Sequence, residues 1–257
     1  MRLYFLGTGT STGVPQIGCN CEVCTSNDPK DRRMRTSAIV ELDGNRLLID
    51  VGPDFYHQIL RADAPPLDAL LITHSHYDHV GGIDDLRPYC ATAPDRHFPV
   101  YCQADVNGDL HDRVPYCFAK NLYPGVPTFS MHEVTPFVPF NIGPFNILPL
   151  EILHYKLHIL GYKINNLVYI TDAKTIPQET LDALKGIDTL VINALRRHEH
   201  MSHMTLDEAL AIIEKVKPRR AWLIHLSHEM GLHATVEKEL PENVGLAYDG
   251  MSIEIPD

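Results

Sequence analysis

The segment that most constrains this chain is a short run of metal-binding side chains directly after a predicted strand. Ala69 to Thr73 has the pattern of a buried strand, and it leads straight into His74-Ser75-His76-Tyr77-Asp78-His79. In extended backbone His74 and His76 project to the same side and can reach one cation, while the turn that follows brings Asp78 and His79 to a second. The motif therefore predicts a metal centre at the end of a strand.

Chance is a poor explanation for this motif. The chain has 15 histidines among its 257 residues. At the frequencies of His and Asp in this chain, about four in a thousand random sequences of the same length would contain the pattern His-x-His-x-Asp-His. The alternative, a set of scattered surface or core histidines, is therefore disfavoured.

Composition limits the class of protein. Hydrophobic residues make up 44% and charged residues 21%, which is typical of a globular protein, and we expect one domain over residues 1–257. No apolar run of about 18 residues and no signal peptide is evident, so we expect a cytoplasmic protein that does not engage a membrane. The net charge of -11 disfavours long nucleic acid as a partner but allows a small anionic substrate. The oligomeric state stays open, a homodimer included.

Short strand-like segments dominate the chain, with a few helical patterns between them. The clearest helix begins at Thr205, where Glu208 completes a capping box, and ends before Pro218. We also expect helices from Pro177, as first helical residue, to near Gly186, and after Gly81-Gly82 as far as Arg87. Residues 105–144 lack clear periodicity, and both a lid and an ordinary surface excursion fit them. The predicted strands are Leu3–Leu6, Ser37–Leu42, Arg46–Ile49, Ala69–Ile72, Val100–Cys102, Phe145–Ile152, His158–Ile164, Leu167–Ile170, Thr189–Ile192 and Ala221–Ile224.

A second cluster of potential ligands lies near the N-terminus. Cys19, Cys21 and Cys24 follow the glycine-rich turn of residues 7–13. Three thiolates this close can hold Zn²⁺ tetrahedrally once a fourth ligand arrives from elsewhere, although three buried, inert thiols are the alternative. The remaining cysteines have the character of buried apolar residues and are Cys90, Cys102 and Cys117.

With these motifs the sequence resembles the metallo-β-lactamase superfamily along most of its length. The resemblance implies an α/β fold, the αββα sandwich, in which two mixed β-sheets are flanked by helices. It also implies that Asp50 supports the metal loop and that Asp172 bridges two cations, although a strand-terminal Asp can also act only as a cap. One cation would be held by His74, His76 and a histidine from a later strand, for which His154 fits better than His158. The second would be held by Asp78, His79 and His225.

Within that superfamily the sequence is most similar to the phosphodiesterase branch, and there to the cyclic phosphodiesterases of the carbon-phosphorus lyase pathway. This similarity implies a structural zinc held by Cys19, Cys21, Cys24 and His228, and a histidine at a helix entry, His203, near the phosphate. We find no basic insertion like the substrate-gripping arm of ribonuclease Z. A ribonuclease Z-like nuclease and a thioester or lactam hydrolase stay as alternatives, and a non-catalytic binding protein is a more distant one.

The implied activity is hydrolysis of a small phosphodiester, a cyclic ribosyl or nucleotide phosphate, by a hydroxide that bridges two divalent ions. Zn, Mn and Ni all suit the mixed His/Asp set, and the additional structural ion is Zn. We expect Asp78 and His203 to be the catalytic residues, with protonated His203 supplying the proton that a departing alkoxide needs. The position of Arg196 beside His203 is suggestive, but the sequence assigns it no role.

Overall fold

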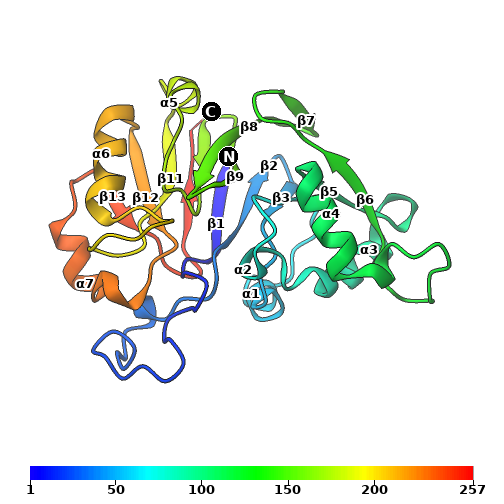
Figure 1. Ribbon diagram of the computed structural model, residues 1–257, viewed down its shortest axis with the longest axis horizontal. Helices are drawn as coiled ribbons and strands as arrows, with labels where there is room; N and C mark the ends of the chain where they lie inside the picture. The colour runs from blue at the N-terminus through cyan, green and yellow to red at the C-terminus, as the bar shows by residue number, and fades with distance from the viewer. Residues whose placement is uncertain (257) are drawn as a thin grey trace.

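The computed structural model describes residues 1–256, and within them the strands form two mixed seven-stranded sheets (Figure 1). In each sheet four consecutive strands pair antiparallel and the rest continue in parallel. The first sheet has the order β14 (Ser252–Glu254), β1 (Arg2–Gly7), β2 (Ser37–Leu42), β3 (Asn45–Ile49), β4 (Ala69–Leu71), β5 (Phe98–Cys102) and β6 (Phe129–Glu133). The second has the order β13 (Val244–Leu246), β12 (Arg220–Ile224), β11 (Thr189–Asn193), β10 (Leu167–Tyr169), β9 (Leu157–Ile164), β8 (Phe145–His154) and β7 (Phe140–Ile142).

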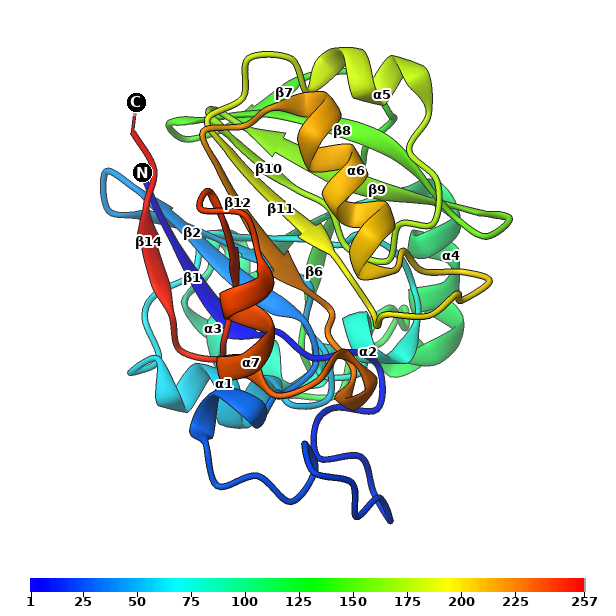
Figure 2. The same cartoon turned by 90° about the vertical axis from the view of Figure 1, so that its left-hand side faces the viewer.

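Helices cover the outer face of each sheet (Figures 1 and 2). Residues of α1, α3 and α4 share an apolar cluster with the first sheet, and residues of α5, α6 and α7 share another with the second. The α-helices are α1 (Phe55–Arg61), α2 (Tyr77–Val80), α3 (Arg87–Thr92), α4 (Ala104–Arg113), α5 (Gln178–Ala183), α6 (Leu206–Val216) and α7 (His233–Val236). Short 3₁₀ helices are η1 (Pro29–Asp31), η2 (Ile83–Leu86), η3 (Pro94–Arg96), η4 (Pro115–Cys117), η5 (His228–Met230) and η6 (Glu237–Glu239).

A third apolar cluster fills the space between the two sheets. It joins side chains such as Phe5 of β1 and Ile49 of β3 to Tyr162 of β9 and Ile224 of β12, all of them fully buried. Each sheet is thus buried on both faces, which explains why the parallel strands read as nearly continuous apolar runs in the sequence. The predicted αββα sandwich with two mixed sheets is confirmed.

The ten strands expected from the sequence are all present, within one or two residues at their ends. The capping box of Thr205 and Glu208 is present too, and α6 ends at Val216 with Lys217, which has left-handed backbone, as its C-cap just before Pro218. The prediction for Pro177 was wrong in detail: it is the N-cap of α5 and not its first helical residue. Extended backbone at Pro177 (ψ 153°) places the ring one residue outside the helix.

Two regions that gave weak signals are ordered in the structure. Residues 105–144 contain most of α4 and the strands β6 and β7, so this segment belongs to the sandwich over much of its length. The segment between β1 and β2, which carries the three clustered cysteines, extends away from the sheets (Figures 1 and 2). Among residues 1–256, no helix combines the length and apolarity needed to cross a membrane.

Candidate metal centre

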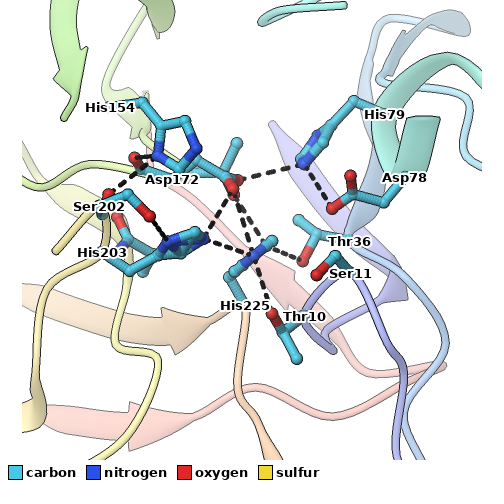
Figure 3. Close-up of polar contacts among 12 residues, drawn as sticks. Thr10, Ser11, Thr36, Asp78, His79, His154, Asp172, Ser202, His203 and His225 are labelled. Atoms are coloured by element: carbon cyan, nitrogen blue, oxygen red, sulfur yellow. Dashed lines mark hydrogen bonds and ion pairs between the residues drawn. The ribbon is translucent and has the colours of Figure 1, made fainter. Parts of the chain in front are cut away.

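The predicted ligands gather where strands of both sheets end, beside the short helix α2. Asp50 follows β3, His154 ends β8, and Asp172 lies shortly after β10. His225 follows β12, and α2 carries Asp78 and His79. Figure 3 shows side chains from both sheets pointing toward one another across this edge. Strand ends supply fixed backbone directions, which is why residues far apart in the sequence converge here.

The first potential ligand group consists of His74, His76 and His154, whose ligand atoms lie within 4.8 Å of one another. Nδ1 of His154 lies 2.8 Å and 2.9 Å from the carbonyl oxygens of Asp172 and Ser202. Because a carbonyl can only accept, Nδ1 carries the proton and Nε2 keeps its lone pair. Nε2 of His74 is buried and has no hydrogen-bond partner. Two of the three histidines thus present an uncommitted ring nitrogen to the same space.

The second potential ligand group is Asp78, His79, Asp172 and His225, all buried and again within 4.8 Å. Nε2 of His79 lies 3.1 Å from Oδ2 of Asp78 and 3.2 Å from Oδ2 of Asp172. Oδ1 of Asp172 lies 3.2 Å from Nε2 of His225. Asp172 therefore presents one oxygen to each of these two histidines, and it is also within 4.8 Å of His154 and His203 as part of a further group.

Charge in the second group is arranged as a cation site requires. Burial by itself raises the pKa of Asp172, but the neighbouring His225 and His79 hold it well below its usual range. The pKa of Asp78 is lowered in the same way, with His79 outweighing burial. The pKa of His79 is raised well above its usual value, since Asp172 and Asp78 outweigh burial. A divalent cation could take the place of the proton that this buried imidazole holds between two ionised carboxylates.

Burial acts differently on the remaining histidines. It lowers the pKa of His74 and of His225, with the charge of His79 adding to the effect at His74. Neutral imidazoles are the form that binds metal ions. Together with Nε2 of His74, which is buried and has no hydrogen-bond partner, these imidazoles and the two carboxylates fit two divalent cations.

Asp50 contacts two residues of the metal-binding segment, Thr73 and His79. Its Oδ1 accepts from the backbone N–H of Thr73 at 2.8 Å, and its Oδ2 accepts from Oγ1 of Thr73 at 2.8 Å. Oδ2 also lies 2.7 Å from Nδ1 of His79. Asp50, Asp172 and His225 all have positive φ, at 58°, 55° and 57°. Such backbone is costly for residues other than glycine and is often found at functional sites.

His203 sits at the junction of the two groups. Its Nε2 lies 3.1 Å from Oδ1 of Asp172 and 3.2 Å from Nε2 of His225. Its Nδ1 lies 3.1 Å from Oγ of Ser202, which fixes the ring in the orientation seen in Figure 3. Burial, with a further contribution from His225, lowers the pKa of His203 to about 3. In the protein without substrate His203 is therefore neutral.

The cysteine cluster forms a separate group that includes His228, three residues beyond His225. Cys19, Cys21, Cys24 and His228 offer ligand atoms within 4.8 Å of one another. The Sγ atoms of Cys19 and Cys21 lie 3.6 Å and 3.3 Å from Nδ1 of His228. A hydrogen bond from the backbone of Cys24 lowers the pKa of Cys21 to about 6, whereas burial raises that of Cys24 to about 11. The donor set of three sulfurs and one nitrogen fits a tetrahedral Zn²⁺.

Comparison with known proteins agrees with this geometry. Residues 45–226 match the family model described as the beta-lactamase superfamily domain. The chain belongs to the beta-lactamase superfamily. A solved structure described as a new diphosphatase from the PhnP family superposes with a TM-score of 0.91 at 36% identity, covering 98% of this chain and 97% of that one.

Other proteins resemble the chain over part of their length or at lower identity. The octanoyltransferase of Porphyromonas gingivalis is 46% identical over 253 residues, which are 98% of this chain and 51% of that protein, so the chain spans about half of this curated relative. Zn²⁺-bound PqqB from Methylobacterium extorquens has a TM-score of 0.80 at 18% identity, with 99% and 100% of the two chains covered. The short form of human tRNase Z has 0.74 at 16% identity, with 100% of each covered, and these two share the fold.

Several residues that the sequence brought into consideration are not part of the potential ligand groups. His158 has 63% of its side chain exposed and pairs with Glu151 at 2.7 Å, so the structure brings His154 and not His158 to the centre. Arg196 pairs with Glu229 at 2.6 Å. Cys90, Cys102 and Cys117 are buried, as expected of apolar residues.

Sequence analysis missed the residues that surround the ligands. Thr36, Thr10 and Thr171 present hydroxyls to His225, and Ser202 contacts His203. The glycine-rich turn of residues 7–13 was a signal for one of them, since Thr10 belongs to it. From α4, Asp109 accepts a hydrogen bond from Ser75 and Arg113 donates one to the carbonyl of Ser75 at 3.0 Å. Lone threonines and serines carry no spacing pattern that would have marked the others.

Proposed function

We propose that the protein is a metal-dependent phosphodiesterase that hydrolyses a small phosphodiester, such as a cyclic ribosyl or nucleotide phosphate. The observation that carries the proposal is the place of His203: its Nε2 lies 3.1 Å and 3.2 Å from Asp172 and His225 of the second ligand group, and its ring also lies within 4.8 Å of a ligand atom of His154 in the first. Neither potential metal group described above needs His203 as a ligand. A histidine at the junction of two cation sites is suited to the proton transfer that a phosphoester leaving group requires.

The ligands have separate proposed tasks. His74, His76 and His154 would hold one cation, and Asp78, His79, Asp172 and His225 the other, with Asp172 placed to contact both. Bound cations of this kind supply charge neutralisation at the phosphoryl oxygens and a water nucleophile that ionises near neutral pH. Asp50 keeps Nδ1 of His79 occupied, so that Nε2 faces the site.

His203 has the proposed task of moving a proton at Nε2. Its low pKa without substrate reflects burial and the neighbouring imidazole. A phosphate anion beside the ring favours the imidazolium, because an opposite charge nearby stabilises the charged form. The protonated ring then donates from Nε2 to the leaving oxygen, while Ser202 holds Nδ1. An alkoxide leaving group depends strongly on such a donor.

A diphosphate ester is the second candidate substrate. It is favoured by the 36% identity, over nearly the whole of both chains, to the structure described as a diphosphatase. Cleavage of a P–O–P bond releases a phosphate, which is a better leaving group than a sugar alkoxide and needs less help from His203. The two candidates therefore differ in how strongly they depend on His203.

Acyl transfer and nuclease activity receive less support. The relative named octanoyltransferase is twice as long as the matched region, so its activity need not belong to the part shared with this chain. The net charge of -11 opposes long RNA, although a tRNase Z shares the fold.

The test is metal analysis followed by a substrate panel. The purified protein is assayed with Zn²⁺, Mn²⁺ or Ni²⁺ against a ribosyl cyclic phosphate, cyclic nucleotides, a nitrophenyl diester, a nucleoside diphosphate ester, RNA and an octanoyl thioester. We expect turnover of a phosphodiester that is lost with a chelator and regained with metal. Turnover confined to the thioester, or equal turnover with and without metal, would contradict the proposal.

A further inference from the structure

His225 presents its two ring nitrogens to different surroundings. Its side chain is fully buried, and Nε2 faces the second ligand group, 3.2 Å from Oδ1 of Asp172 and 3.1 Å from Oγ1 of Thr10. Nδ1 has different neighbours, with Oγ1 of Thr36 3.3 Å away and Oγ1 of Thr171 3.5 Å away (Figure 3 labels Thr36). Only Nε2 can therefore serve a cation held with Asp172.

Both hydroxyls that face Nδ1 have already committed their proton. Oγ1 of Thr36, which is buried, donates to the carbonyl of Gly9 at 2.8 Å. Oγ1 of Thr171 donates to Oδ2 of Asp172 at 2.5 Å. A hydroxyl has a single proton, so each of these oxygens can only accept from the imidazole. The surroundings of Nδ1 thus favour a proton on Nδ1 and a lone pair on Nε2.

The same arrangement recurs at His74. Oγ1 of Thr73 donates to Oδ2 of Asp50 at 2.8 Å and lies 3.0 Å from Nδ1 of His74. Nε2 of His74 is buried and unpartnered on the side of the first ligand group. In both ligand groups a threonine with a committed proton stands behind one histidine.

We propose that Thr36 is a positioning residue of the metal centre, which accepts the Nδ1 proton of His225 and so holds Nε2 ready for the cation. The inference rests on the proposed metal dependence and not on the identity of the substrate. Partners of this kind orient a ligating imidazole and raise its basicity, and their loss typically weakens metal binding about 10–100-fold.

Thr36 also ties the glycine-rich turn to the metal centre. Gly9, which accepts from Thr36, approaches so closely that a Cβ there would lie 2.9 Å from Cβ of Arg33. The turn pairs through Thr8 and Thr10 with the backbone of Leu226, at 3.0 Å and 3.1 Å. The backbone beside His225 and the ring of His225 are therefore held by one element, which gives the turn a role in the site.

The experiment compares Thr36→Val, which removes the hydroxyl at nearly constant shape, with Thr36→Ser, which keeps it. Thr189→Val is the matched control, because Thr189 is a buried threonine at the opposite end of β11 from the site. Zn²⁺ affinity is measured by competition with a chromophoric chelator. Long-range proton–nitrogen NMR of the zinc-loaded parent identifies which nitrogen of His225 carries the proton.

We expect Thr36→Val to bind one Zn²⁺ about 10–100-fold more weakly, and Thr36→Ser and Thr189→Val to stay within a few-fold of the parent. We expect the parent spectrum to place a slowly exchanging proton on Nδ1. Parental affinity in folded Thr36→Val, or a loss in Thr36→Ser as large as in Thr36→Val, would overturn the inference. If Thr36→Val does not fold, the parent spectrum decides, since a proton on Nε2 of His225 overturns it as well. A parent protein that binds no metal at these residues would overturn the proposed function as well. That result is distinct from the failure of the Thr36 inference alone, in which the parent still binds metal.

Discussion

Nε2 of His203 lies 3.1 Å from Oδ1 of Asp172, the carboxylate placed closest to both potential ligand groups. The two residues come from different parts of the second half of the chain, Asp172 from the loop after β10 and His203 from the loop that leads into α6. Under the proposed function, this contact would hold the imidazole of His203 beside a phosphoryl group bound at the metal centre. The chemistry of the leaving group can therefore be used to test it.

His203→Ala should separate substrates by their leaving groups. General acid catalysis contributes about 10²–10⁴ in rate, so we expect a loss of that size on a sugar cyclic phosphate. A nitrophenyl diester should lose far less, because nitrophenolate departs without a proton. The measurement is kcat/KM of parent and variant on both substrates at full metal loading.

The outcomes of that comparison are distinct. An equal loss on both substrates would assign His203 to phosphate contact or metal binding, which its distance from Asp172 and His154 also allows. His198→Ala is a suitable control, because His198 has 60% of its side chain exposed and pairs with Glu229. No loss on either substrate would leave His203 as a plain residue at the start of a helix.

Asp172→Ala should abolish turnover and lower the metal content of the binuclear centre, while the Cys-containing group keeps its ion. The removed carboxylate contacts His79, His203 and His225, so its loss takes an anionic ligand out of the centre of the donor set. His225→Ala should behave in the same way. Metal content by mass spectrometry and activity at saturating metal are the measurements, and His158→Ala is the matched exposed-histidine control. Near-normal activity of Asp172→Ala would contradict the binuclear assignment.

Asp50→Asn should weaken metal binding while leaving the fold in place. The amide keeps the shape of the carboxylate, but it cannot accept through both oxygens from Thr73 and His79. We expect metal affinity to fall about 10–100-fold, as is common when a partner behind a metal-binding histidine is altered. A chelator titration measures this, and unchanged affinity would show that Asp50 serves only the backbone of Thr73.

Much of this site could be predicted because its ligands follow buried strands. A strand such as Ala69–Leu71 has a strong apolar pattern, and polar residues directly after it must lie at the sheet edge. His74 was placed by this reasoning, whereas Asp172 and His225 were assigned through the resemblance to the superfamily. The sandwich of two mixed sheets was likewise implied by the resemblance to the superfamily.

The remainder depends on tertiary contacts that leave no pattern in a single sequence. Thr36 and Ser202 act through one hydroxyl each, and neither their spacing nor their type is unusual. The helix α4 has weak amphipathic character and includes Gly108, so it was not expected, although Asp109 and Arg113 connect it to Ser75 in the metal loop. Tertiary packing decides whether a segment without clear periodicity forms an edge strand or a lid. In residues 105–144, β6 and β7 are edge strands of the two sheets.

Loss of the cysteine site should affect stability before it affects chemistry. Cys19, Cys21, Cys24 and His228 join the extended N-terminal loop to the segment three residues beyond His225, so a zinc ion there would stabilise the folded state directly. We expect Cys21→Ser to contain one zinc fewer and to melt at lower temperature. For a chain of this size each kcal/mol lost lowers Tm by roughly 2–4 °C, so a loss of several kcal/mol gives a shift of about 10 °C. Asp172→Ala, which spares this group, should retain its zinc and serves as the comparison. A Cys21→Ser protein that melts like the parent and contains the same number of metals would show that the cysteines hold no structural ion.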